Sequence, residues 1–157
     1  MKRVLIATLV MAAVLAFCRV PAIATEKASK EECVALCHKA AEMVKTKGLA
    51  ATLKAVADPH GPFILKDTYV FAMSTVTGSV LAHPYKPGLV GKNLLGLKDV
   101  NGVMFFAEIL KIGKSKKGEG WVNYMWPKPG EKKPSPKTTY VYKVPGQDVS
   151  FCAGIYQ

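Results

Sequence analysis

The turn-forming residues 58–62 (Asp-Pro-His-Gly-Pro) divide the chain into a helical part and a β-rich part. Before this turn, apolar residues recur at three-and-four spacing, and Ser29 and Glu32 form a capping-box pattern in front of them. The sequence therefore predicts an amphipathic helix that begins after Ser29 and ends at Gly48, with a short second helix over 49–56. The apolar positions of the first helix are Cys33, Leu36, Cys37, Ala40 and Val44.

After the turn, each apolar stretch is short and most are bounded by glycine or proline. Alternating β-branched and aromatic residues predict strands, and one helical pattern interrupts them. The strands are joined mainly by hairpin turns, so we expect an antiparallel sheet with the helices packed to one side, an α+β domain. The predicted segments are strands 68–75, 79–83, 121–126, 138–144 and 149–156 and a helix over 101–114.

The first 24 residues have the pattern of an export signal. Lys2 and Arg3 precede an uncharged run over 4–17, and Ala22-Ile23-Ala24 provides small residues where a signal peptidase cleaves. The run is too short for a membrane-spanning helix, which needs about 20 apolar residues. We therefore expect cleavage after Ala24, a soluble periplasmic product with no membrane anchor, and a single domain over 25–157.

The charge balance indicates the kind of partner. Removing residues 1–24 leaves 19 basic against 11 acidic residues, a net charge near +8. A positive balance favours anionic partners. No zinc-finger spacing or other nucleic-acid signature accompanies it, so we expect a small organic acid rather than nucleic acid.

Motifs of enzymes are absent from the sequence. It contains no nucleophile elbow, no glycine-rich phosphate loop and no H-E-x-x-H motif. His38, His60 and His83 lie far apart and show no metal-ligand spacing. We therefore expect a protein that is not an enzyme and has neither a metal site nor an obligatory cofactor.

Several short phrases, in order and at matching spacing, resemble the single Cache domain family of extracytoplasmic, PAS-like sensor domains. Together they cover nearly all of residues 30–157. The phrases are residues 58–63 (Asp-Pro-His-Gly-Pro-Phe), 81–84 (Leu-Ala-His-Pro), 90–93 (Val-Gly-Lys-Asn), 120–127 (Gly-Trp-Val-Asn-Tyr-Met-Trp-Pro), Pro136-Lys137 with Tyr140-Val141, and 154–156 (Gly-Ile-Tyr).

The resemblance implies a long N-terminal helix across a five-stranded antiparallel sheet, and a pocket for a small organic molecule, often a short carboxylate. Most members of that family belong to chemoreceptors and sensor kinases. No membrane helix or signalling module follows the domain before Gln157. We therefore expect a chemotaxis-related sensor that acts as a free binding protein, or that passes its signal to a membrane receptor or sensor kinase.

Five residues are the candidates for the ligand site: His83, Tyr124, Trp126, Lys137 and Tyr140. Lys137 would be the counter-ion of a carboxylate, His83 and Tyr124 its hydrogen-bond donors, and Trp126 an apolar wall. Tyr140 ranks below them, because one tyrosine of its strand can face the long helix instead. The alternatives are that the aromatic residues belong to the core or to a dimer contact, and that Lys137 is solvated.

Cys33, Cys37 and His38 support a second hypothesis, a c-type haem protein for redox or gas sensing. Haem c attachment normally uses C-x-x-C-H, and the spacing here is one residue longer. Other readings of the cysteines are a disulfide between one of them and Cys152, or free buried thiols. A third functional class is an interaction protein without a ligand, in which the long helix forms a homodimer.

Overall fold

The computed structural model describes residues 26–157, so the predicted signal peptide and its cleavage site lie outside the described residues. None of the helices in this range is long and apolar enough to span a lipid bilayer. The elements in chain order are α1 (Lys30–Lys47), α2 (Leu49–Ala57), β1 (Ile64–Leu65), β2 (Thr68–Ser74), β3 (Val80–Ala82), the 3₁₀ turn η1 (Pro87–Leu89), α3 (Phe105–Lys114), β4 (Glu119–Pro127), β5 (Pro134–Lys143) and β6 (Val149–Tyr156).

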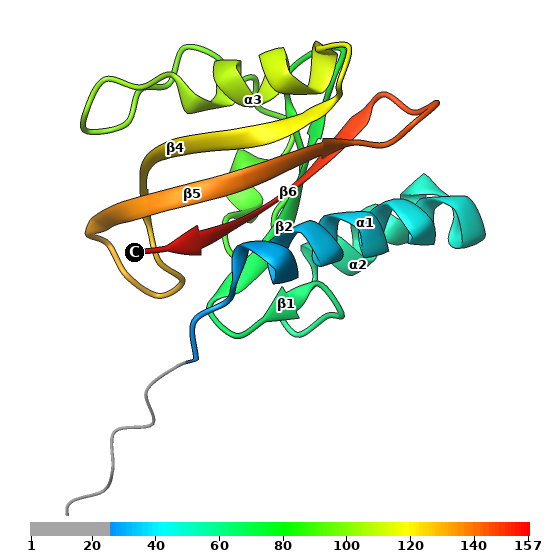
Figure 1. The fold of residues 1–157 in the computed structure, drawn as a ribbon, viewed down its shortest axis with the longest axis horizontal. Helices are drawn as coiled ribbons and strands as arrows, with labels where there is room; N and C mark the ends of the chain where they lie inside the picture. The colour runs from blue at the N-terminus through cyan, green and yellow to red at the C-terminus, as the bar shows by residue number, and fades with distance from the viewer. Residues whose placement is uncertain (1–25) are drawn as a thin grey trace, which may run out of the picture.

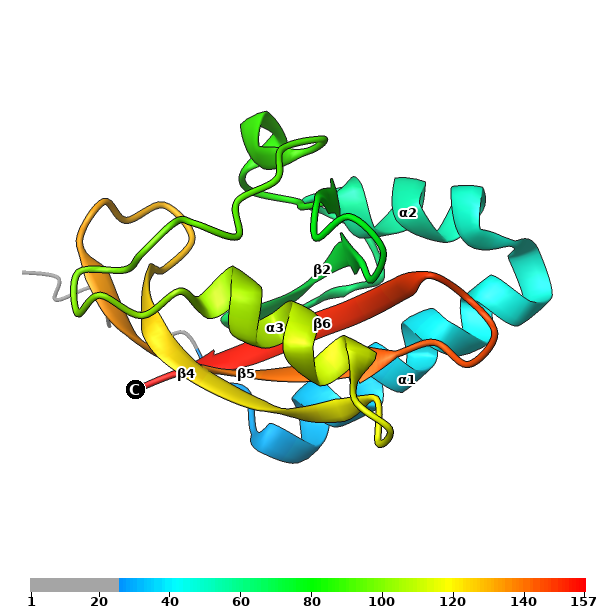
Figure 2. The same ribbon diagram turned by 90° about the horizontal axis from the view of Figure 1, so that it is seen from above.

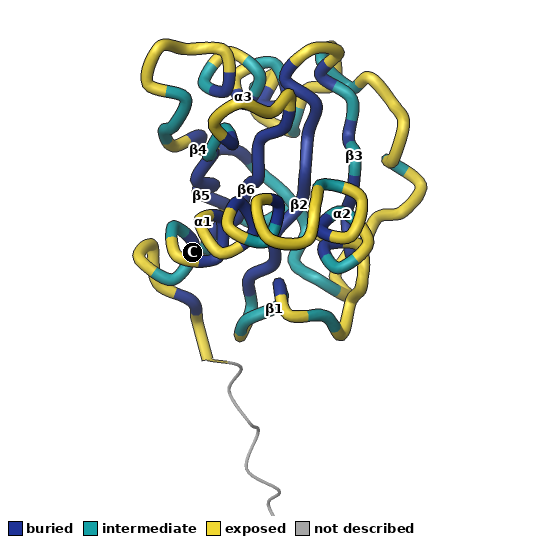
Figure 3. Tube along the Cα trace, turned by 90° about the vertical axis from the view of Figure 1, so that its right-hand side faces the viewer, coloured by how far each residue is buried: buried dark blue, intermediate teal, exposed yellow. Residues whose placement is uncertain are grey.

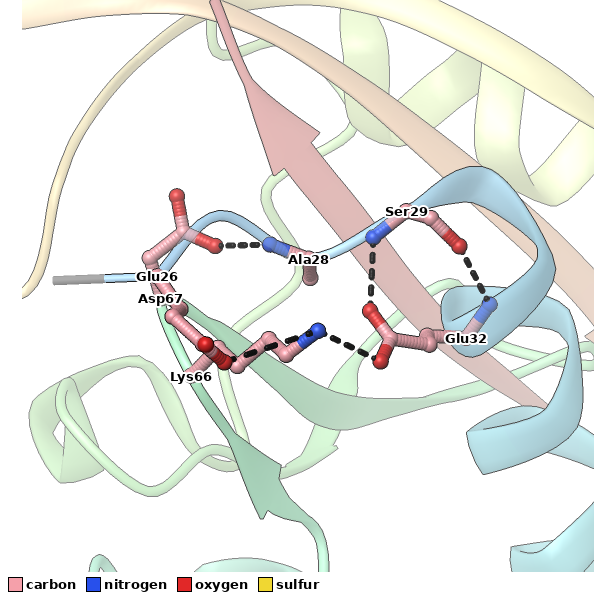
Figure 4. A network of polar contacts seen from close by, with 6 residues as sticks. All are labelled: Glu26, Ala28, Ser29, Glu32, Lys66 and Asp67. Atoms are coloured by element: carbon pink, nitrogen blue, oxygen red, sulfur yellow. Dashed lines mark hydrogen bonds and ion pairs between the residues drawn. The ribbon is translucent and has the colours of Figure 1, made fainter.

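The start of α1 is held by the predicted capping box (Figure 4). The backbone N–H of Glu32 donates to Ser29 Oγ over 3.2 Å, and the Glu32 carboxylate accepts from the N–H of Ser29 over 2.8 Å. The other carboxylate oxygen of Glu32 pairs with Lys66 Nζ at 2.7 Å. The N–H of Ala28 donates to Asp67 over 2.7 Å. The cap therefore also fastens α1 to the β1–β2 turn.

The strands form an antiparallel sheet in the order β1-β2-β6-β5-β4, and β3 pairs with β2 (Figure 1). The five strands expected from the sequence are therefore present, and the two-residue β1 is a short addition. The α+β fold with a long N-terminal helix and an antiparallel sheet is confirmed. β2 and β6 lie in the middle of the sheet, and nearly all of their residues are buried.

The helices cover both faces of the sheet, which corrects the prediction that they pack to one side (Figures 1 and 3). α1 and α2 form one apolar cluster with one face, and α3 forms a second cluster with the other. The reason is the composition of the central strands. Both faces of β2 and β6 carry apolar side chains, so both need a covering layer.

Element boundaries differ from prediction where side chains override local propensity. α3 begins at Phe105 rather than near residue 101, because Asp99 organises a turn in which Gly102 has φ +83°. β5 begins at Pro134, within a proline-rich stretch predicted to be a loop. The prolines lie in the first residues of that strand, where a missing N–H is tolerated.

We predict that Ser29→Ala lowers the free energy of unfolding by about 1 kcal/mol, because the N–H of Glu32 loses its acceptor at the start of α1. Urea denaturation followed by circular dichroism measures the change. Ser135→Ala is the matched control, since Ser135 lies in β5 and caps no helix; its effect should stay within about 0.5 kcal/mol. Equal losses in both variants would contradict a specific role for the cap.

Candidate functional site

An internal cavity lies between the sheet and α3, on the face opposite α1. Its volume is about 10 Å³, far below the 300–1,000 Å³ typical of pockets for drug-sized ligands. This is room for about one water molecule, so a larger ligand enters only if the wall moves. Aromatic residues and one histidine form its wall: Tyr69, Phe71, His83, Phe105, Phe106, Tyr124 and Trp126.

Lys137 brings a positive charge to this region from β5. It faces Tyr124 of β4 and Tyr156 of β6 in the strand register, and its exposed fraction is 2%. Its Nζ lies 4.1 Å from the ring centre of Tyr69 and 4.7 Å from that of Tyr156. These rings give the ammonium cation–π contacts. Within residues 26–157, Lys137 takes part in no ion pair.

Gly154 provides the space through which the Lys137 side chain crosses β6. A Cβ atom at residue 154 would lie 2.9 Å from Lys137 Cε, 2.4 Å from Thr139 Oγ1 and 2.8 Å from the Thr138 carbonyl oxygen. These separations are shorter than carbon atoms tolerate. Any side chain at residue 154 would therefore displace Lys137, Thr139 or the strand itself.

His83 is buried at the end of β3, and its ring packs against two residues of β2. The ring centre lies 5.0 Å from that of Tyr69 and 5.7 Å from that of Phe71. Its Nδ1 accepts hydrogen bonds from the N–H groups of Tyr85 and Lys86, over 3.2 and 3.1 Å. Since Nδ1 is an acceptor, a neutral ring carries its proton on Nε2, which makes Nε2–H the hydrogen-bond donor.

The environment keeps His83 neutral. Burial, followed by the positive charges of Lys137 and Lys86, lowers the pKa of His83 from 6.5 to about 3. The imidazole is therefore uncharged over the whole physiological range. The fixed positive charge beside the cavity belongs to Lys137.

Tyr124 and Trp126 form a wall of the cavity from β4. The Tyr124 ring stacks on that of Phe105, with ring centres 4.3 Å apart and planes 3° from parallel. Trp126 meets Phe105 edge-on at 5.4 Å. The Tyr124 hydroxyl lies 2.9 Å from Thr139 Oγ1 and shares a hydrogen bond with it. The structure thus brings four of the five predicted residues together: His83, Tyr124, Trp126 and Lys137.

Tyr140 lies apart from that group, in the cluster on the α1 face of the sheet. Its hydroxyl donates to the Glu119 carboxylate, and its ring lies 5.1 Å from that of Trp121. The separation follows from the strand period: Lys137 and Tyr140 are three residues apart in β5, so their side chains point to opposite faces. The expected grouping of Tyr140 with the other four residues is therefore wrong.

The cysteines do not fit a haem c site. Cys33 and Cys37 are fully buried between α1 and the sheet, whereas the His38 side chain is exposed and packs against Tyr142 at 4.2 Å. Thioether bonds to a porphyrin would require both sulfur atoms at an accessible surface. Among residues 26–157, no cluster of three metal-ligating side chains occurs either.

Of the two other readings of the cysteines, the disulfide is absent, because Cys33, Cys37 and Cys152 are all free thiols. Cys152 packs in the cluster on the α3 face, whereas Cys33 and Cys37 pack in the cluster on the α1 face. The sheet therefore separates the sulfur atoms. The alternative reading, free buried thiols, describes the structure.

Sequence reasoning missed the cavity residues Tyr69, Phe71, Phe105 and Phe106. The pair Tyr69 and Phe71 carries a usable signal, since residues two apart in a strand share a face. The strand was predicted, but nothing in its fully apolar sequence indicates which face borders a cavity. Phe105 and Phe106 fall within the helix predicted over 101–114, where Phe106 belongs to the apolar side.

Comparisons with known proteins agree with this geometry. Residues 38–157 match the profile of the family described as Cache domain. The methyl-accepting chemotaxis protein McpP of Pseudomonas putida is 32% identical over 71 residues, which is 45% of this chain and 13% of that receptor. The match therefore spans a small part of the receptor's length.

Solved structures give the same result. A methyl-accepting chemotaxis protein from Vibrio parahaemolyticus superposes with a TM-score of 0.67 and 27% identity, over 81% of this chain and 87% of that one. A Cache chemosensory domain reported for its carboxylic acid recognition superposes with a TM-score of 0.63 and 25% identity, over 80% and 86%. A periplasmic sensor domain of a chemotaxis protein shares the fold, with a TM-score of 0.62 and 24% identity, over 80% and 88%. The family match over residues 38–157 and the shared fold together establish that the chain belongs to the Cache domain family.

Proposed function

We propose that this chain is a non-enzymatic sensor domain that binds a short organic carboxylate in the cavity between the sheet and α3. The observation that carries the proposal is Lys137, a buried cation that forms no ion pair within residues 26–157. A buried charge without a counter-ion is costly. A carboxylate at the cavity would supply that counter-ion.

The other groups at the site suit the same ligand. The Nε2–H of His83 is a neutral donor for a carboxylate oxygen, and the aromatic wall excludes water and contacts a short alkyl chain. Cation–π contacts hold the ammonium of Lys137 before a ligand arrives. Because the closed cavity is small, short acids such as acetate, pyruvate and lactate would require the least displacement of its wall. The carboxylic acid recognition reported for one structural neighbour supports this ligand class.

The cellular setting is part of the proposal. The signal-peptide pattern of residues 1–24 and the periplasmic domain among the structural neighbours support a location in the periplasm. The similarity to chemoreceptors supports a role in chemotaxis-type sensing, with a membrane receptor or sensor kinase as the partner that reads the bound state.

We predict that Lys137→Met abolishes carboxylate binding and leaves the domain folded. Methionine keeps the length of the stem and removes the charge, so the ligand loses its counter-ion while the unpaired buried charge disappears. The ligand-free variant should unfold at a temperature at least as high as the wild type. A thermal-shift screen with acetate, pyruvate and lactate, followed by calorimetric titration, measures both effects.

Lys133→Met, at an exposed position in the β4–β5 hairpin, is the control for the loss of one lysine and should bind like the wild type. Undiminished ligand stabilisation in Lys137→Met would contradict the site. If no short carboxylate stabilises the wild type, the proposed ligand class is wrong.

We predict that carboxylate affinity changes less than about twofold between pH 7.5 and 5.5. An ordinary histidine, with a pKa near 6.5, would gain a positive charge over that range and strengthen the binding of an anion. With a pKa of about 3, His83 stays neutral, and a carboxylic acid with a pKa near 4 stays ionised. Calorimetric titration at the two pH values is the measurement. A rise in affinity of tenfold on acidification would show that His83 titrates normally.

A further inference from the structure

The segment between β3 and α3 is largely irregular and includes the short turn η1 (Figure 2). Half-buried apolar residues of this segment pack on the cavity-side cluster: Tyr85, Leu89, Leu94, Leu95 and Val103. The first half is bonded to β3, since the N–H of Gly91 donates to Val80 and the N–H of Val80 donates to Lys92. Residues 94–104, which we name the lid, follow this bonded part.

A single hydrogen bond ties the lid to the sheet. Asp99 Oδ2 accepts from the backbone N–H of Met125 in β4 over 2.7 Å. Among the hydrogen bonds of the described residues, no other joins residues 94–104 to a strand. The other carboxylate oxygen, Oδ1, accepts from the N–H groups of Asn101 and Val103 inside the lid, over 2.9 and 2.8 Å. One side chain therefore shapes the lid and fastens it.

The hydrogen bond between Asp99 and Met125 lies next to the site. Met125 stands between Tyr124 and Trp126, which both line the cavity, and Phe105 directly follows the lid. Lys137 and His83 are 2% and 4% exposed, so a ligand reaches them only if part of the covering structure moves. Lid residues Asp99, Asn101 and Val103 line a surface hollow together with Tyr124 and Lys137. Gly102 within the lid has φ +83°.

We propose that Asp99 is the latch of this lid and sets the rate at which a ligand enters and leaves the cavity. The inference rests on the proposed function for the identity of the ligand, but the opening itself is a property of the ligand-free protein. Burial alone would raise the pKa of Asp99, and the N–H groups of Met125, Val103 and Asn101 lower it more, so the carboxylate is ionised at neutral pH. A hydrogen bond to a charged acceptor is about twice as strong as a neutral one.

The variant Asp99→Asn tests the latch with little change of shape. The Oδ1 of the asparagine keeps the hydrogen bonds from Asn101 and Val103. Its amide N–H₂ then faces the N–H of Met125, and because both groups are donors, the hydrogen bond to Met125 is lost. Asp99→Ser is a second variant, because its hydroxyl accepts from a nearby N–H within the lid but is too short to reach Met125. Asp148→Asn, in the exposed β5–β6 turn, makes the same change of charge at a distant position.

Two measurements decide the inference. Hydrogen exchange of the Met125 amide, followed by NMR on the ligand-free protein, should accelerate by about tenfold or more in both Asp99 variants and stay unchanged in Asp148→Asn. In stopped-flow mixing with acetate, pyruvate or lactate, the association and dissociation rate constants should both rise by about tenfold. Kd should change less than threefold, because the latch closes the free and the bound protein alike.

Unchanged exchange of the Met125 amide would overturn the latch, whether or not a ligand is found. A weaker Kd with an unchanged association rate would also overturn it, since that result assigns Asp99 to the binding site itself. If no carboxylate binds the wild type while the Met125 amide still exchanges faster in both variants, the ligand proposal fails and the latch stands.

Discussion

The burial of β2 and β6 on both faces is the constraint on which the rest of the structure depends. Strands that carry apolar side chains on both faces need two covering layers, and the chain provides α1 with α2 on one face and α3 with the lid on the other. The two layers differ in how regular their backbone structure is. The α1 layer is a regular 18-residue helix fixed by a capping box, whereas the α3 layer is a 10-residue helix that follows an irregular segment. The cavity lies under the less regular layer.

The chemistry of the cavity follows from where the sheet places its polar groups. Lys137 enters the α3 face through the strand register, opposite Tyr124 and Tyr156, and the side chains around it are rings rather than carboxylates. His83 is held by backbone N–H groups at the start of the covering segment, and the same environment keeps it uncharged. A fixed cation and a neutral donor are therefore both in place beside the cavity in the ligand-free protein.

Local sequence patterns predicted most of the fold, and four of the five residues proposed for the site lie close together. The capping box, the helical spacing of Cys33 and Cys37, and the glycine turns gave the element order, because these signals act over a few residues. The grouping of Tyr140 with Lys137 was wrong, because a one-residue difference in strand parity moves a side chain to the other face. Phe105 and Phe106 could not be assigned to the cavity, since an apolar helix face looks the same over a core and over a cavity. Asp99 gave no signal at all, because its partner Met125 is 26 residues away in sequence.

Gly154 shows where the shape of this cavity is most restricted. The residue does not line the cavity, yet a β-carbon there would collide with Lys137 Cε and with the Thr139 hydroxyl that partners Tyr124. The absence of a side chain at residue 154 therefore leaves room both for Lys137 and for the Thr139 hydroxyl that bonds Tyr124. A redesign of the domain to recognise another molecule can thus vary the aromatic wall residues one by one, but must keep glycine at residue 154.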